Sequence, residues 1–341
     1  MDTIRLFPFG EVAWFYGAFT LLVIALLALD LGVFHRKAHE VRYKEALGMT
    51  ALWTAVAGLF GVGLWWFARI SFASDPRLTA IPGFDAEAAA NSVALEYVTG
   101  WVIEKALAVD NLFVFAMVFA YFGIPTRYQH RVLFYGIAGA LVFRAVFIAL
   151  GATLLQFHWV VVLAGLFLVF TGLKMAFGPE KPIDPDSTWI VRAVRRVIPI
   201  TPGLEGDRLF VRKAGRWFGT PLLVALVCIE ASDIVFAIDS VPAIFAVTDE
   251  PLIVFTSNVF AILGLRSLYF VLTDLLARFH LLKYSLAAVL VFVGAKMVYL
   301  NEAFGGKFPI AASLGIVVGL LVVGAAASAV WPKPASEVQP E

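Results

Sequence analysis

Six acidic residues lie inside strongly apolar stretches of this sequence, where each would cost about 2.5–3.5 kcal/mol if it faced lipid. Two of them are Asp30 and Glu230. The other four form two pairs, and in each pair the acids are six residues apart and an amide or hydroxyl residue follows the second acid. The first group is Glu104, Asp110 and Asn111, and the second is Asp233, Asp239 and Ser240. Oxygen ligands of these kinds suit hard cations such as Mg²⁺, Ca²⁺ and Mn²⁺. The two groups together with Glu230, seven residues in all, form the candidate metal site. Asp30 is a candidate pathway or ion-pair residue.

Three basic residues lie at comparable depth: Lys105, Arg144 and Arg266. These bases could form ion pairs that hold helices together or could take part in a transport pathway, and the sequence favours neither role. Six carboxylates against three cations leave three negative charges that a divalent cation, protons or both would balance. The five histidines lie outside the apolar interiors and Cys228 is the only cysteine, so the interior offers oxygen ligands almost exclusively.

Helical spacing brings some of these residues together. At 100° per residue, residues seven apart share a face, so Glu104 and Asn111 can converge, as can Asp233 and Ser240. Glu230 lies about 60° away from Asp233. The second acid of each stretch points roughly 100° away from the residue that follows it. Ideal helices therefore cannot bring all the acids to one ion.

The elements that position these residues must be membrane helices. Of 341 residues, 61% are apolar and only 15% are charged, and a net charge of +1 gives no basic field for nucleic acid. Apolar stretches long enough to cross a bilayer predict an all-α polytopic membrane protein with about nine transmembrane helices. Pro242 predicts a break beside Asp239, since its ring would free the carbonyl of Ile238. The expected spans are about 12–34, 46–67, 95–122, 132–154, 159–177, 220–247, 252–276, 281–300 and 308–331.

Lysine and arginine are concentrated in the odd-numbered connections, above all in the fifth, residues 178–219. This asymmetry predicts an N-terminus outside and a C-terminus in the cytoplasm. Within the fifth connection, residues 189–198 form a basic amphipathic piece that could lie on anionic headgroups, or could simply orient the chain. We expect the tail, 332–341, to be disordered.

An internal repeat relates the third, fourth and fifth spans to the sixth, seventh and eighth. Asp239 follows Asp110 by 129 residues, and Arg266 follows Arg144 by 122. The segment GLKM at 172–175 recurs as GAKM at 294–297. Three spans are an odd number, so the second copy must be inverted, an arrangement typical of transporters. The expected divisions are 1–90, a first repeat at 91–178, a cytoplasmic loop at 179–219, an inverted repeat at 220–301, and a last helix with the tail at 302–341.

Long motifs in this sequence resemble the TerC family of integral membrane proteins, particularly its Alx-like branch. They are EYVTGWVIEK at 96–105 with DNLFV at 110–114, TPGLEGDR at 201–208, EASDIVFAIDSVPA at 230–243 and DLGVFHRK at 30–37. The resemblance implies a multi-pass protein of the bacterial inner membrane, related to LysE-type exporters, first named for tellurium resistance and associated with manganese export. It carries the metal-pathway role onto Glu104, Asp110, Asn111, Glu230, Asp233, Asp239 and Ser240.

The main hypothesis is a secondary transporter that exports divalent cations, above all Mn²⁺, through carboxylates at the membrane midplane. The same carboxylates could take protons in exchange. Two other classes stay open: a non-transporting membrane scaffold linked to metal or tellurium stress, and an exporter of a small cationic metabolite. We expect no enzyme, no prosthetic group and no nucleic-acid partner, since no nucleophile–base pair or P-loop is visible. The expected partners are the cation and the lipid bilayer, and a homo-oligomer is left open.

Overall fold

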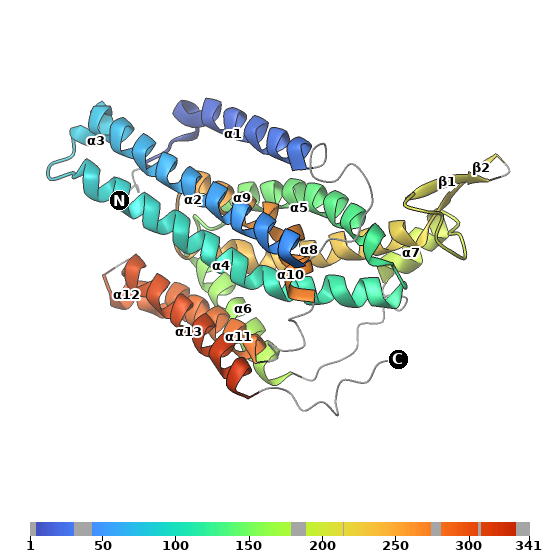
Figure 1. The fold of residues 1–341 in the computed structure, drawn as a ribbon. Coiled ribbons are helices and arrows are strands. Elements are labelled where there is room, and N and C mark those ends of the chain that lie inside the picture. Colours follow the sequence, from blue (N-terminus) through green and yellow to red (C-terminus); the bar gives the residue numbers. More distant parts are fainter. Residues whose placement is uncertain are drawn as a thin grey trace.

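The fold was analysed in a computed structural model, which describes residues 5–30, 43–178, 189–213, 215–273, 281–305 and 308–331. Long helices lie side by side, and a small β-hairpin projects from one end of the bundle (Figure 1). The helices and strands are α1 (Phe9–Leu29), α2 (Tyr43–Ser74), α3 (Pro76–Thr79), α4 (Ala86–Tyr121), α5 (Thr126–Leu154), α6 (His158–Phe177), α7 (Trp189–Val197), β1 (Phe210–Lys213), β2 (Arg216–Gly219), α8 (Pro221–Phe245), α9 (Pro251–Leu263), α10 (Leu265–Thr273), α11 (Leu282–Ala295), the π-helix η3 (Lys296–Leu300), α12 (Asn301–Ala303) and α13 (Ile310–Val330).

The predicted all-α membrane fold is confirmed. Within the described ranges, seven helices are long and apolar enough to span a membrane, and the bent pair α9–α10 makes an eighth. The helix at the place of the third predicted span, α4, has 36 residues and is about 54 Å long, but its charged residues keep it out of that set. The count of nine spans therefore stays a prediction, as do the division of the chain and its orientation.

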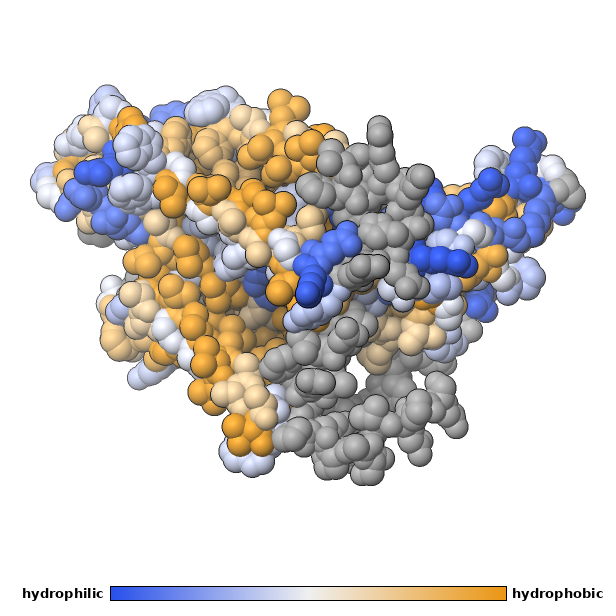
Figure 2. Space-filling model, in the orientation of Figure 1, coloured by the Kyte–Doolittle hydropathy of each residue, from blue (hydrophilic) through white to orange (hydrophobic). Residues whose placement is uncertain are grey.

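Apolar side chains cover the outside of the bundle between two polar ends. Figure 2 shows a broad hydrophobic band over the helices, with hydrophilic residues at the α3 end and at the hairpin end. Leu21, Leu59 and Phe177 are 69%, 72% and 82% exposed. Exposed apolar surface of this extent is expected where lipid, rather than water, surrounds the protein.

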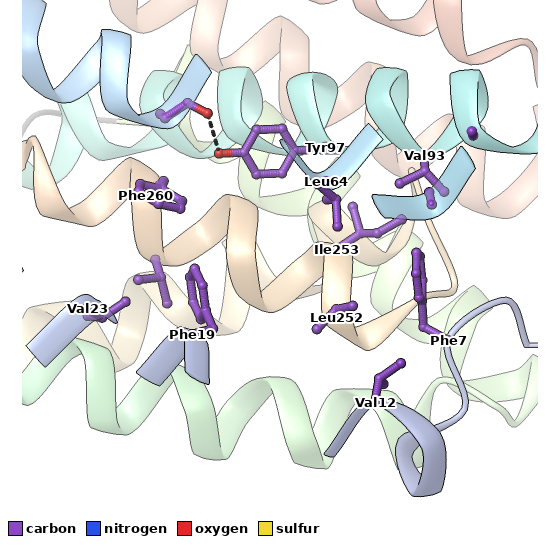
Figure 3. Packing of buried hydrophobic residues seen from close by; sticks show 14 of the residues in the cluster. Phe7, Val12, Phe19, Val23, Leu64, Val93, Tyr97, Leu252, Ile253 and Phe260 are labelled. Atoms are coloured by element: carbon purple, nitrogen blue, oxygen red, sulfur yellow. Dashed lines mark hydrogen bonds between the residues drawn. The ribbon is translucent and has the colours of Figure 1, made fainter. Parts of the chain in front are cut away.

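One apolar core joins α1 and the segment before it to α2, α4 and α9 (Figure 3). Phe19 of α1 and Phe260 of α9 pack together, with ring centroids 5.7 Å apart. Tyr97 of α4 donates a hydrogen bond of 3.0 Å to the carbonyl of Ala57 in α2, which satisfies its buried hydroxyl. This core fixes the N-terminal helices against the helices that carry the candidate site.

Two helix breaks differ from expectation. Pro242 does not interrupt α8, which runs through it to Phe245, so the predicted break beside Asp239 is wrong. Pro242 lies in the last turn, where the loss of one backbone hydrogen bond is tolerated. The break comes instead in the seventh predicted span, 252–276, where α9 and α10 meet at 41° around Gly264. The end of that span, and residues 31–34 of the first, lie outside the described ranges.

The fifth connection contains more structure than expected. The basic piece is helical as α7, and Val191 is buried, with α7 packed against α8. The antiparallel strands β1 and β2 follow it, and they were not expected from the sequence. Residues 179–188 and the tail, 332–341, lie outside the described ranges, so the expectation of a disordered tail is not tested.

Candidate functional site

A buried polar network joins four helices at the centre of the bundle. The Nη1 atom of Arg144 in α5 donates to Glu104 Oε1 in α4, to Ser240 Oγ in α8 at 3.1 Å and to Asn258 Oδ1 in α9 at 3.1 Å. The Asn258 amide donates in turn to Glu104 Oε2 at 3.4 Å. Glu104 is 0% and Arg144 3% exposed. Arg144 therefore has an ion-pair role, and Asn258 joins the site as a residue absent from the predicted ligand set.

A second contact ties α4 to α8. The Asn111 side chain donates to Asp233 Oδ1 at 3.4 Å, and both residues are buried. In the predicted repeat, Glu104 corresponds to Asp233 and Asn111 corresponds to Ser240. The pair Asn111–Asp233 therefore corresponds to the pair Ser240–Glu104, which Arg144 bridges. Contacts that exchange in this way are expected when two copies face each other across a two-fold axis.

The packing of α6 on α11 has the same property. A Cβ added to Gly294 would lie 2.5 Å from the carbonyl oxygen of Gly165, and one added to Gly172 would lie 2.7 Å from that of Ala287. The offset of 122 residues converts one contact into the other. Glycine is needed at both places because the two helix backbones approach so closely. The inverted repeat stays a prediction, and these contacts agree with it.

A cavity of about 270 Å³ opens beside the network and contains the last of the three acids of α8, Asp239. Asp239 faces it and accepts a hydrogen bond of 3.4 Å from the Thr171 hydroxyl of α6. Sequence reasoning missed Thr171 as a site residue and used Lys174 only as a marker of the repeat. The recurring GLKM and GAKM segments were the available signal. The polar residues that line the cavity are Asn111, Arg144, Thr171, Lys174, Asp239 and Ser240.

Glu230 lies one turn before Asp233 on α8, against Gly139 of α5. A Cβ at Gly139 would overlap the carboxylate, so glycine makes the room that Glu230 occupies. The Oε2 atom of Glu230 is buried and has no hydrogen-bond partner among the described residues. Buried oxygens are nearly always satisfied, so this one points to a proton or a ligand.

The remaining predicted residues lie in other contacts. Asp30, at the end of α1, accepts a hydrogen bond of 2.5 Å from Arg266 in α10, and this ion pair ties α1 to the bent helix. Lys105 lies against the break itself, because a Cβ at Gly264 would be 2.8 Å from its Nζ. Asp110 belongs to α4, but its side chain is outside what the structure describes.

The described side chains divide the predicted acids between separate places. The structure brings Glu104, Asn111, Asp233 and Ser240 together, and puts Asp239 in the adjoining cavity. No group of three or more histidine, cysteine, aspartate or glutamate side chains is arranged to hold a metal within the described part of the chain. The role of these residues as direct metal ligands therefore stays a prediction.

Comparison with known proteins gives a consistent match. A family model, described as the integral membrane protein TerC family, matches residues 89–336. The chain is 47% identical over 323 residues to an uncharacterised membrane protein of Myxococcus xanthus, with 94% of each chain covered. It is 42% identical over 310 residues to an Escherichia coli protein named as a candidate membrane-bound redox modulator, Alx, which covers 90% of this chain and 92% of that one. No solved structure matches.

Proposed function

The chain belongs to the TerC family of integral membrane proteins, and on that basis we propose that it is a secondary transporter that exports divalent cations, principally Mn²⁺, in exchange for protons. Its place would be the bacterial inner membrane, with the N-terminus outside and the C-terminus in the cytoplasm. The observation that carries the proposal is the buried polar network between α4 and α8, with the adjoining cavity that Asp239 faces.

The charge balance of the described site supports a cation as cargo. Two of the six interior acids have arginine partners, because Arg144 pairs with Glu104 and Arg266 pairs with Asp30. Glu230, Asp233 and Asp239 all belong to α8 and hold no salt bridge among the described residues. Since charges inside a membrane protein mark ion pathways or proton relays, α8 is the helix on which we place the path.

The donor chemistry narrows the cargo. Carboxylate, amide and hydroxyl oxygens surround the path, and such oxygens favour Mn²⁺, Mg²⁺ or Ca²⁺ over Cu⁺ or Zn²⁺. A carboxylate that releases a metal ion can bind a proton, which provides the exchange. The name of the Escherichia coli relative refers to redox chemistry, but dithiol exchange within this chain is not available, because Cys228 is its only cysteine.

Efflux from proteoliposomes loaded with Mn²⁺ tests the proposal. We expect Asp110→Asn and Asp239→Asn to lower the initial rate at least about tenfold, since an amide cannot supply the negative charge that holds the ion. Glu87→Gln is the matched control, because Glu87 is an exposed acid in the first turn of α4. Equal efflux by the wild type and both aspartate variants would remove the basis of the proposal. Acidification of the lumen that depends on Mn²⁺ outflow would identify proton exchange.

A non-transporting membrane scaffold is the second candidate function. The ion pairs Arg144–Glu104 and Arg266–Asp30 favour a structural role for these four residues. A scaffold predicts that the α8 acids affect stability alone. Thermal unfolding of the purified protein with and without Mn²⁺ separates the two functions. Stabilisation by Mn²⁺ that is lost in Asp239→Asn supports transport, whereas unfolding temperatures that ignore the metal support the scaffold.

A further inference from the structure

Each predicted repeat ends in a segment that borders its own cavity. Lys174 and Met175, near the end of α6, line the cavity of about 270 Å³ that contains Asp239. Lys296 and Met297, at the junction of α11 and η3, line a second cavity of about 110 Å³. The second cavity also contains Asp249, just beyond the end of α8. The two lysine–methionine pairs, which correspond in sequence, therefore line two different cavities, whose other lining residues do not correspond.

The two copies of this segment adopt different states. Lys174 is exposed and lies on a regular α-helix, next to the wide cavity. Lys296 is 2% exposed and begins the π-helix η3, next to the narrow cavity. A π-helix is rare and is frequently found at functional sites, and a fully buried lysine is also rare. The lysine of this motif is thus exposed in the first copy, which we call released, and buried in the second copy, which we call withdrawn.

Lys174 can reach the acid of its cavity. Thr171, whose hydroxyl bonds Asp239, lies three residues before Lys174 and shares its helix face. An ammonium group in this position can occupy the place of a metal cation beside the carboxylate. The predicted repeat relates Lys174 to Lys296, so the two lysines hold the same position in the sequence of their copies.

We propose that Lys174 and Lys296 are a pair of gating residues that alternate between these two states during the transport cycle. In the present conformation the Lys296 side is closed and the Lys174 side is open. In the opposite conformation Lys174 is withdrawn, its cavity narrows, and Lys296 is released. Inverted repeats can exchange conformations in this manner, which carries a central site from one side of the membrane to the other. The inference rests on the proposed transport function and adds residues to its path.

Two cysteine reporters measure the states of the two cavities. In a Cys228→Ala background of the full-length protein, Met175→Cys and Met297→Cys each place one thiol in one cavity. The rate of reaction with a charged maleimide is measured in nanodiscs without metal. We expect the Met175→Cys reporter to react faster than the Met297→Cys reporter. Adding Lys296→Gln should open the second side and close the first, because it removes the charge whose interactions hold Lys296 inside the protein.

The expected signature is reciprocal. Minor conformations are commonly populated at roughly 0.1–10%, so the exchange should raise labelling of Met297→Cys, and lower that of Met175→Cys, about tenfold or more. Lys174→Gln is the matched control of opposite sign, because it disfavours the second conformation. It should slow labelling of Met297→Cys and leave Met175→Cys unchanged. Being exposed in the present conformation, Lys174 can be replaced without disturbing a packed core, so this arm is decisive even if Lys296→Gln does not fold.

Faster labelling at Met297→Cys with no change at Met175→Cys would show local loosening and would overturn the proposal. So would a Lys174→Gln variant whose Met297→Cys reporter reacts at the wild-type rate. The labelling needs no metal, which separates this inference from the choice of cargo. Reciprocal labelling combined with absent Mn²⁺ efflux would support the paired lysines and reject Mn²⁺ as the transported ion.

Discussion

Replacement of Arg144 by methionine should destabilise the protein strongly, because it leaves the Glu104 carboxylate buried without its cation. Glu104 is 0% exposed, and one Arg144 nitrogen also serves Ser240 and Asn258. Breaking a buried ion pair on one side costs about 3–5 kcal/mol. At about 2 °C per kcal/mol for a long chain, the unfolding temperature should fall by roughly 6–10 °C.

The assay is thermal unfolding of the purified protein in detergent, followed by tryptophan fluorescence. The double variant Arg144→Met with Glu104→Gln should recover at least half of the loss, since it leaves no charge buried without a partner. The matched control is Arg127→Met, which removes an exposed arginine from the first turn of the same helix. A single variant within about 1 kcal/mol of the wild type, or a double variant with additive losses, would refute this account of the network.

Two further predictions concern helix packing and pH. Gly294→Ala should cost about 1–3 kcal/mol of stability, because its Cβ would lie 2.5 Å from the Gly165 carbonyl oxygen, whereas Gly315→Ala, with open space around it, should cost almost nothing in the same unfolding assay. Burial raises the pKa of Glu250 above its ordinary 4.5, although the Leu6 amide donates to its carboxylate at 2.6 Å. A raised folded-state pKa means that folding favours the protonated acid, so stability should decline as the pH rises from about 4.5 through that pKa. Glu250→Gln should flatten this part of the stability–pH curve, and an unchanged slope would contradict the assignment.

Sequence spacing predicted the local geometry of the site well. Residues seven apart on one helix were expected to share a face. Asn111 of α4 bonds Asp233 of α8, and Glu104 of α4 bonds Arg144, which in turn bonds Ser240 of α8. The membrane class followed from apolar length, which is a property of each segment alone. Such features depend on helix period and composition, and both can be read without knowledge of the packing.

Contacts between distant segments could not be predicted in this way. Arg144 finds its partners 96 and 114 residues further along the chain, and no local pattern specifies them. The room for Glu230 comes from Gly139 on another helix. The bend at Gly264 was missed for a similar reason, because Lys105 of α4 and Trp53 of α2, both distant in sequence, pack against that glycine. Pro242 was the stronger local signal for a helix break, yet α8 continues through it, and the break lies at Gly264, where contacts with distant segments decide the backbone path.

The asymmetry between the two predicted copies argues for where a cation would bind. The repeat equates Glu104 with Asp233, but their partners differ in charge. Glu104 receives the Arg144 guanidinium, whereas Asp233 receives the neutral Asn111 amide. The arginine that corresponds to Arg144 in the second copy pairs with an acid of α1, outside both copies. Asp233 therefore has no salt bridge among the described residues, and a proton or a mobile cation that neutralises its carboxylate would bind along α8.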